Sequence, residues 1–292
     1  MTPTIPVDPP ITEYSLPLQR EVALFHDSFD MPNLIATPGP LPVDRIALRI
    51  GLLQEEGIDE LTEAIIQNDH VDIIDALIDT VYVALGALVE MGQDGGEFLH
   101  TDGRPFFETF NAQALVDEAK IALQGNRLSL LMLERAFQQQ DAERATIILR
   151  TIVLGALRPF GRADLDPRPF FDEVQRANMS KLGADGKPVH SRGLELDGYP
   201  AGKVLKGAGY SAPDLPSIFA SVVEGKKARL ENMSDFERGA RAGVEAMRLY
   251  FQDENEGAIY GEIPTSLLDR FEKGAVHDVL RDEVMSTENA AR

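Results

Sequence analysis

Apolar residues recur at helical spacing along most of this chain, and strand-like alternation is weak throughout. Two long patterns stand out, one over residues 43–67 and one over residues 70–91. The second is apolar on almost every side, which is typical of a buried helix. The sequence therefore predicts an all-α fold in which this helix is buried.

Shorter patterns predict the remaining elements. Further helices are expected at residues 18–29, 105–123, 127–139, 142–157, 167–179, 214–231, 234–252 and 264–282. Prolines and glycines predict loops at residues 31–42 and 182–213, and a Pro-rich arm at residues 1–17. The 234–252 helix is amphipathic and is expected to pack on the body or to mediate oligomerisation.

Two segments resemble each other within the chain. "DGRPFFETF" (102–110) and "DPRPFFDEV" (166–174) share a motif, and "DTVYVALGAL" (79–88) resembles "RTIVLGAL" (150–157). These echoes predict a degenerate internal duplication, a pseudo-dimer with halves at about 43–112 and 115–178. In the second half, Arg150 stands in the place of Asp79 and Thr146 in the place of Asp75.

Composition narrows the class of protein. The 292 residues carry 28 basic and 48 acidic side chains, a net charge of −20, which argues against nucleic acid as a partner. There is no cysteine, so thiolate metal sites and disulfides are excluded. No signal peptide and no membrane-spanning run is recognised, and a soluble, cytoplasmic protein is expected.

The acidic residues are unevenly placed. Residues 50–103 contain thirteen of them and no lysine or arginine. In the first long helix Glu56, Asp59, Glu60 and Glu63 share one face, which by itself is an ordinary solvated face. Something outside this segment must balance the charge.

The second long helix makes the stronger argument. Asp72, Asp75 and Asp79 fall within an arc of about 60° on a helix that is otherwise apolar. Aspartates on a buried helix are strongly disfavoured unless they are paired or bind a metal. Two readings remain open, a divalent cation or a distant arginine such as Arg150. Because the candidate ligands are all carboxylates, the cation would be Mg²⁺, with Mn²⁺ possible, and such sites serve phosphate chemistry.

These residues resemble a known family. "QEEGID" (54–59) followed by "DIIDALID" (72–79) is similar to the EExxE…ExxD signature of the all-α nucleoside-triphosphate pyrophosphohydrolases, which include MazG-like proteins, phosphoribosyl-ATP pyrophosphohydrolase and dimeric dUTPases. "FFDEVQRANMSK" (170–181), "ADGKPV" (184–189) and "KGAGYSAPDL" (206–215) resemble the C-terminal end of such members. The last Glu of EExxE is Asp59 here, although Glu60 stands beside it, and either Asp75 or Asp79 fills the final Asp position.

The resemblance implies a MazG-like helical bundle and a set of site residues. Metal ligands would come from Glu56, Asp59, Glu60, Asp72, Asp75 and Asp79. Glu55 or Glu56 would act as general base. Substrate contacts would come from Asn178, Lys181, Lys187 and Lys206. In the pseudo-dimer hypothesis the first half supplies the metals and the second supplies "RANMSK".

The sequence thus predicts a Mg²⁺-dependent hydrolase that converts a (d)NTP and water to (d)NMP and pyrophosphate in nucleotide pool control. Two alternatives remain, a phosphoribosyl-ATP pyrophosphohydrolase and a non-catalytic metal-binding or scaffold member of the same fold. The expected domains are an arm (1–17), the pyrophosphohydrolase domain (18–215) and a C-terminal helical extension (216–292). The expected partner is a nucleoside triphosphate, with no nucleic acid, no membrane and a possible homo-oligomer.

Overall fold

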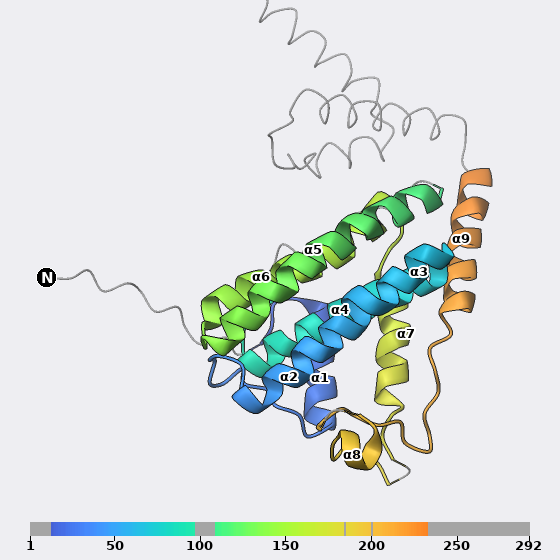
Figure 1. The fold of residues 1–292 in the computed structure, drawn as a ribbon. Coiled ribbons are helices and arrows are strands. Elements are labelled where there is room, and N and C mark those ends of the chain that lie inside the picture. The colour runs from blue at the N-terminus through green and yellow to red at the C-terminus, as the bar shows by residue number, and fades with distance from the viewer. Residues whose placement is uncertain (1–12, 97–108, 184, 200, 233–292) are drawn as a thin grey trace, which may run out of the picture. The chain divides into compact units, whose positions relative to one another are not determined.

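The computed structural model describes residues 13–96, 109–183, 185–199 and 201–232. In these ranges the chain is helical with no strand, and an isolated antiparallel bridge joins His190 to Val204. The prediction of an all-α bundle is therefore confirmed (Figure 1). The elements are α1 (Pro17–Ser28), α2 (Val43–Gln54), the π-helix η1 (Glu55–Glu60), α3 (Leu61–Gln67), α4 (His70–Met91), α5 (Ala112–Gln138), α6 (Ala142–Arg162), α7 (Arg168–Met179), α8 (Leu194–Asp197) and α9 (Leu215–Glu231).

Contacts divide the chain into two compact units, residues 1–227 and 228–292. The helices predicted at 234–252 and 264–282 lie outside the described residues, as does the start of the helix predicted at 105–123. The domain boundaries and the internal duplication stay predictions. No helix in the described ranges combines the length and the apolar character that crossing a membrane requires.

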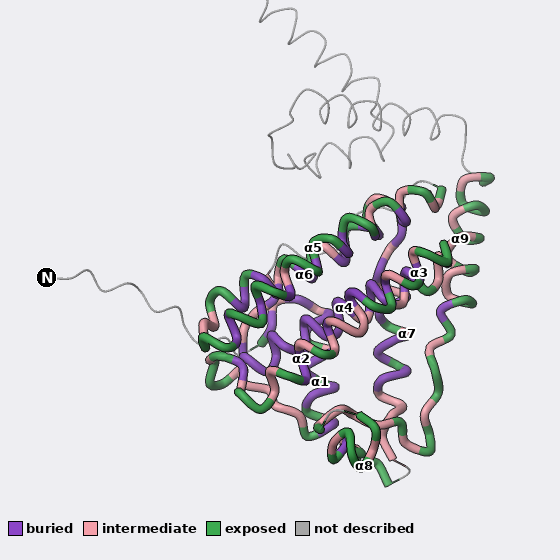
Figure 2. Tube along the Cα trace, viewed as in Figure 1, coloured by how far each residue is buried: buried purple, intermediate pink, exposed green. Residues whose placement is uncertain are grey.

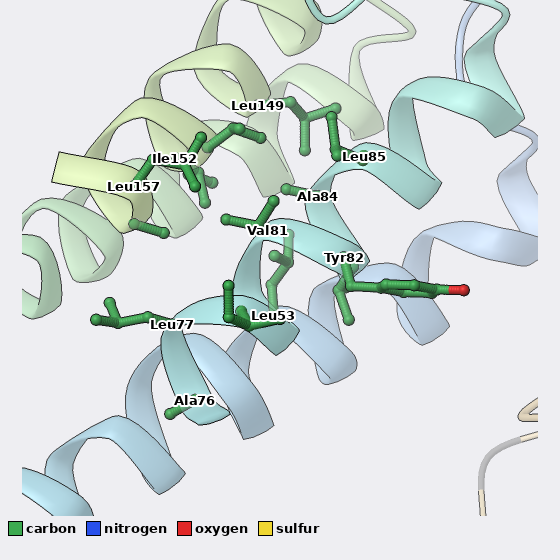
Figure 3. Close-up of a cluster of buried hydrophobic side chains, with 14 of the residues drawn as sticks. Leu53, Ala76, Leu77, Val81, Tyr82, Ala84, Leu85, Leu149, Ile152 and Leu157 are labelled. Atoms are coloured by element: carbon green, nitrogen blue, oxygen red, sulfur yellow. The ribbon is translucent and has the colours of Figure 1, made fainter. Parts of the chain in front are cut away.

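Helix α4 is the centre of the core. Between Ile73 and Met91 every residue is buried except Asp75 and Asp79. Helices α1, α2, α6 and α7 pack around it, and Figure 2 shows its long buried stretch. Figure 3 shows Val81 and Leu85 of α4 beside Leu149 and Ile152 of α6. The two aspartates therefore occupy the one face of α4 that the apolar core leaves open.

The acidic helices form a hairpin. Helix α2, η1 and α3 follow one another without a break from residue 43 to residue 67, as the sequence predicts. Asn68 then adopts a left-handed conformation with φ of 55°, which ends α3. The side chain of Asp69 caps α4 by accepting hydrogen bonds from the Val71 and Asp72 amides. This tight connection brings η1 back alongside α4.

The helices of the second half differ from the prediction. The expected break between residues 123 and 127 is wrong, because α5 continues from Ala112 to Gln138. Gly125 is exposed in the middle of this helix, whereas Asn126 is 5 % exposed and faces the core. A single glycine costs a helix only about 1 kcal/mol, and packing of α5 along α6 offsets it. Helix α6 also runs further than predicted, to Arg162.

A buried ion network fastens α2 to α4. The Glu90 side chain is fully buried and its Oε1 accepts from Arg49 Nη2 at 2.8 Å and from Arg45 Nε at 3.0 Å. Arg49 also lies 3.1 Å from His26 Nε2, and His26 Nδ1 lies 2.7 Å from the Pro32 carbonyl. Burial and then the charge of Arg49 lower the pKa of His26 to about 3, so this imidazole is neutral.

Gly92 ends α4 and offers a first test of this packing. Its φ is 63°, and a Cβ there would lie 2.1 Å from the Leu34 carbonyl oxygen. We expect Gly92→Ala to lower the free energy of unfolding by about 2 kcal/mol or more, since strain and a backbone clash add up. Urea unfolding measures the change. Gly125→Ala is the matched control. A Cβ at position 125 has no atom within 4 Å, and the free energy of unfolding is expected to rise by about 0.5–1 kcal/mol. A wild-type stability for Gly92→Ala would contradict the close packing of Leu34 on this turn.

Candidate functional site

The candidate site begins at the π-helix. Glu55, Glu56 and Glu60 each offer a carboxylate oxygen, and these oxygens lie within 4.8 Å of one another. In an α-helix residues four apart share a face, but the wider π-helical turn bonds residue i to i+5 and shifts that spacing by one. Glu55 and Glu60, five residues apart, are thereby brought together. A π-helical turn inside an α-helix is frequent at functional sites.

Asp79 and Asp75 of α4 extend this cluster. Burial, then the charge of Asp75 and those of Glu60 and Glu55, raise the pKa of Asp79 to about 7 despite an opposing effect of Lys181. Burial, then the charges of Glu60 and Asp72, raise the pKa of Asp75 to about 6. The Asp75 Oδ1 atom is buried with no hydrogen-bond partner. Both aspartates thus interact with the charges of the η1 glutamates, and Asp75 does so with no hydrogen-bond donor at its Oδ1.

Glu56 carries the largest perturbation in the cluster. Burial, followed by the charges of Asp79, Glu60 and Glu55, raises the pKa of Glu56 to about 9. At neutral pH, and with no cation, this carboxyl therefore keeps its proton. Carboxylates that repel one another to this degree are what a divalent cation neutralises, and hard oxygen donors suit such an ion. The residues present therefore fit a metal centre.

Two of the predicted ligands lie apart from this group. Asp59 is exposed, and its Oδ1 accepts a hydrogen bond from Gln54 Nε2 at 2.8 Å. Asp72 is also exposed; burial and then the charges of Asp69 and Glu63 raise its pKa. It thus stands at the outer edge of the aspartate row, near the start of α4.

Lysines from the segment after α7 supply positive charge. Lys203 Nζ lies 2.8 and 3.1 Å from the two carboxylate oxygens of Glu55. Lys181 Nζ donates to Asn178 Oδ1 at 2.6 Å. Burial lowers the pKa of Lys181, and the charges of Lys206 and Lys203 add to this effect against those of Asp79 and Glu56. Asn178 and Lys181, predicted from the resemblance, therefore stand beside the acidic cluster.

The other two predicted substrate contacts are more remote. Lys206 is exposed, with its Nζ 4.6 Å from the centre of the Tyr210 ring. Its charge nevertheless helps to lower the pKa of Lys181. Lys187 is exposed on a turn where the Gly183 amide donates to the Lys187 carbonyl at 2.8 Å. Lys203 was not predicted. Its sequence signal is only one more lysine in a Gly-rich loop, and its place depends on how that loop returns to η1.

Backbone bonds set that return. The Ser191 amide donates to the Lys203 carbonyl at 2.8 Å, and the Gly207 amide donates to the Lys181 carbonyl at 3.0 Å. The Tyr82 hydroxyl donates to Gln175 Oε1 at 2.6 Å and fastens α7 to α4. Lys181 and Lys203 are thereby presented to the acids from one side.

Some of the acids in residues 50–103 are paired with basic residues from other parts of the chain, and others are not. Arg45 and Arg49 balance Glu90, and Lys203 pairs with Glu55. Arg150, the arginine considered as a counter-ion for the aspartate row, instead donates to the Asp94 carbonyl at 2.6 and 2.8 Å. Among the described residues no salt bridge is formed by Glu56, Glu60, Asp75 or Asp79. The charge of these four acids is therefore not balanced by an ion pair within the described part of the chain.

Comparison with known proteins agrees with this geometry over part of the chain. Residues 23–100 match the sequence profile of the phosphoribosyl-ATP pyrophosphohydrolase family. This range contains η1, α4 and every acid of the cluster. The resemblance to the MazG-like all-α pyrophosphohydrolases, stated from the acidic motif, is therefore confirmed. Searches of curated proteins and of solved structures gave no significant match.

Proposed function

We propose, from the pyrophosphohydrolase profile of residues 23–100, that this protein is a Mg²⁺-dependent nucleoside triphosphate pyrophosphohydrolase that acts on (d)NTPs in nucleotide pool control. One observation carries the proposal: the carboxylates of the three glutamates on η1 lie within 4.8 Å of one another. The charges of Asp75 and Asp79 on α4 interact with this group, and two lysines stand beside it. Acids that hold cations next to lysines that hold phosphates are what phosphoanhydride cleavage requires. The reaction would take a (d)NTP and water to (d)NMP and pyrophosphate by breaking the bond between the α- and β-phosphates.

The metal ligands in this proposal are Glu56, Glu60, Asp75 and Asp79, the acids of the cluster that form no salt bridge within the described residues. Glu60 takes the last Glu position of the EExxE motif, because it is Glu60 rather than Asp59 whose carboxylate meets Glu55 and Glu56. When bound, Mg²⁺ (or Mn²⁺) would supply charge for the phosphate oxygens and acidify a water molecule.

The protein's own groups then have distinct tasks. Glu55 is already held by Lys203, so we assign the general base to Glu56, which would take the proton of the attacking water. Lys181 and Lys203 would hold the phosphates, and Asn178 would orient Lys181 through the bond to its ammonium group.

The lysine assignment is tested by a pair of substitutions. We expect Lys203→Met to raise KM for the nucleotide by about tenfold or more, since a charge-assisted contact to phosphate is worth about 1.5–3 kcal/mol. Lys187→Met removes the same charge from an exposed turn and should leave KM within about twofold. Steady-state assays of pyrophosphate release decide the matter, and equal effects of the two variants would refute the assignment.

The raised pKa values make a further prediction about pH. A carboxyl whose pKa is higher in the folded state binds more protons there, so its ionisation destabilises the fold as pH rises. In EDTA, the melting temperature is expected to fall from about pH 4, where the unfolded carboxyls ionise, up to about pH 9. The contribution of Asp75 ends at about pH 6, that of Asp79 at about pH 7 and that of Glu56 at about pH 9. Mg²⁺ should remove most of this slope because it replaces the protons. Thermal melts at several pH values provide the measurement, and a metal-free melting temperature that rises over this range would contradict the cluster.

The function itself is tested with a panel of substrates. The full chain is incubated with canonical and modified (d)NTPs and with phosphoribosyl-ATP, in Mg²⁺, in Mn²⁺ and in EDTA. Metal-dependent release of pyrophosphate and monophosphate from one or two (d)NTPs would support the proposal. Hydrolysis of phosphoribosyl-ATP alone would favour the second candidate, which the name of the matching family supports. Metal binding with no release from any nucleotide would establish a non-catalytic protein.

A further inference from the structure

The wide turn of η1 is held by a residue of another helix. The Asn126 side-chain Nδ2 donates to the Gly57 carbonyl at 3.0 Å. Asn126 belongs to α5, lies outside residues 23–100, and is 5 % exposed. A hydrogen bond from a buried side-chain amide to a backbone carbonyl inside another helix is unusual, because helical carbonyls ordinarily accept hydrogen bonds from amides of their own helix.

The backbone hydrogen bonds of η1 depart from the α-helical pattern next to that carbonyl. The Leu61 amide would bond to the Gly57 carbonyl in an α-helix, but it bonds to the Ile58 carbonyl instead. The Thr62 hydroxyl also donates to the Ile58 carbonyl, and Arg127 donates to that hydroxyl at 3.3 Å. Adjacent residues of α5 thus contact the turn at two points.

Gly57 permits this contact. A Cβ at position 57 would lie 3.2 Å from Asn126 Nδ2 and 3.3 Å from Thr80 Oγ1. The two side chains and Gly57 line a small cavity together with Leu53, Leu130 and Ile152. At Gly57, η1 is therefore closely packed against α5 and α4.

We infer that Asn126 is a positioning residue that stabilises the π-helical turn and thereby brings Glu60 to the same face as Glu55 and Glu56. The inference rests on the proposed metal centre. A π-helical turn amounts to one residue inserted into an α-helix, and the helix regains regular spacing if that insertion is lost. Without the hydrogen bond from Asn126, η1 is free to tighten toward α-helical spacing, which would turn Asp59 rather than Glu60 toward Glu55.

The chain offers a direct test by deletion. Removing Asp59, which is exposed, accepts a hydrogen bond from Gln54 and is not part of the glutamate group, leaves Glu-Glu-Gly-Ile-Glu, with the three glutamates at regular α-helical spacing and Gly57 and Ile58 still in place. In that background the helix already has regular α-helical spacing, so the hydrogen bond from Asn126 is no longer needed to place the third glutamate. Mn²⁺ alone serves as the probe, and its binding to the full chain is followed by the loss of the free-ion electron paramagnetic resonance signal.

We expect Asn126→Ala to weaken Mn²⁺ binding at least about tenfold in the natural chain but by less than about twofold in the Asp59 deletion. Leu130→Ala, which enlarges the same cavity but keeps the Asn126–Gly57 hydrogen bond, should leave Mn²⁺ affinity unchanged, and thermal melts confirm that each variant is folded. Wild-type affinity in Asn126→Ala would overturn the inference. An equal loss in both backgrounds would also overturn it, since that result identifies a packing role. The inference and the proposed function can fail separately. If Mn²⁺ binding depends on Asn126 as expected but the wild-type chain hydrolyses no nucleotide, the inference is supported and only the proposed function is refuted.

Discussion

Replacing Asp79 with asparagine is expected to lower the rate of pyrophosphate release by about 10³-fold, because a metal ligand supplies several kcal/mol of transition-state stabilisation. Asp79 interacts strongly with the other groups of the cluster. Among the neighbouring charges it has the largest effect in raising the pKa of Glu56, and Lys181 in turn lowers the pKa of Asp79. Asparagine keeps the shape of the side chain and removes that charge. The rate of pyrophosphate release at saturating substrate and Mg²⁺ is the measurement.

The same variant should become more stable when no metal is present. Loss of one negative charge relieves the repulsion among Asp75, Glu56 and Glu60, so the melting temperature in EDTA is expected to rise. Lost activity with gained stability is the signature of a functional charge cluster and not of a damaged core. Asp59→Asn is the control, since Asp59 is exposed and bonded to Gln54, and it should change neither quantity. Retention of more than about a tenth of the activity in Asp79→Asn would refute the catalytic role of the cluster.

Glu90→Gln is expected to lower the free energy of unfolding by about 3–5 kcal/mol, the cost of breaking a buried ion pair from one side. Two arginines, Arg45 and Arg49, donate to this fully buried carboxylate. Burial alone would raise the pKa of Glu90, but the guanidinium groups of Arg49 and Arg45 lower it to about 2. The amide cannot balance the guanidinium charges that remain in the core. Urea unfolding at neutral pH gives the free energy.

The acid limb of the stability curve supplies a second readout for Glu90. A carboxyl whose pKa is lowered on folding stabilises the protein above its unfolded pKa, and that contribution disappears as pH falls toward the folded value. The wild type should therefore lose more stability than Glu90→Gln between about pH 5 and pH 2. Asp117→Asn, which removes the carboxylate of an exposed pair with Lys120, should leave the urea midpoint unchanged. If Glu90→Gln matched that control, the network would not fasten α2 to α4.

Local sequence signals account for the acidic hairpin. The 70–91 helix is predicted with the bounds that the structure has, since Asp69 is a capping residue and Gly92 can take a left-handed conformation. The aspartate row was visible because three acids in an otherwise apolar helix conflict with burial. The helix break predicted between residues 123 and 127 was wrong because local signals were misleading there. Gly125 and Asn126 are poor helix formers, but Asn126 forms a hydrogen bond with η1 across 69 positions of sequence, which a local pattern does not show.

The sequence by itself determined the all-α class, the buried helix and the acidic family motif, because helical periodicity, capping and charge placement act over a few residues. Only the tertiary structure decided which acids meet. The choice of Glu60 over Asp59 depends on one π-helical turn, and no local propensity predicts a turn that is held by Asn126 of another helix. The partners of the acids, Arg45 and Arg49 for Glu90 and Lys203 for Glu55, were likewise decided by packing, since electrostatic pairing depends on distance in space and not along the chain.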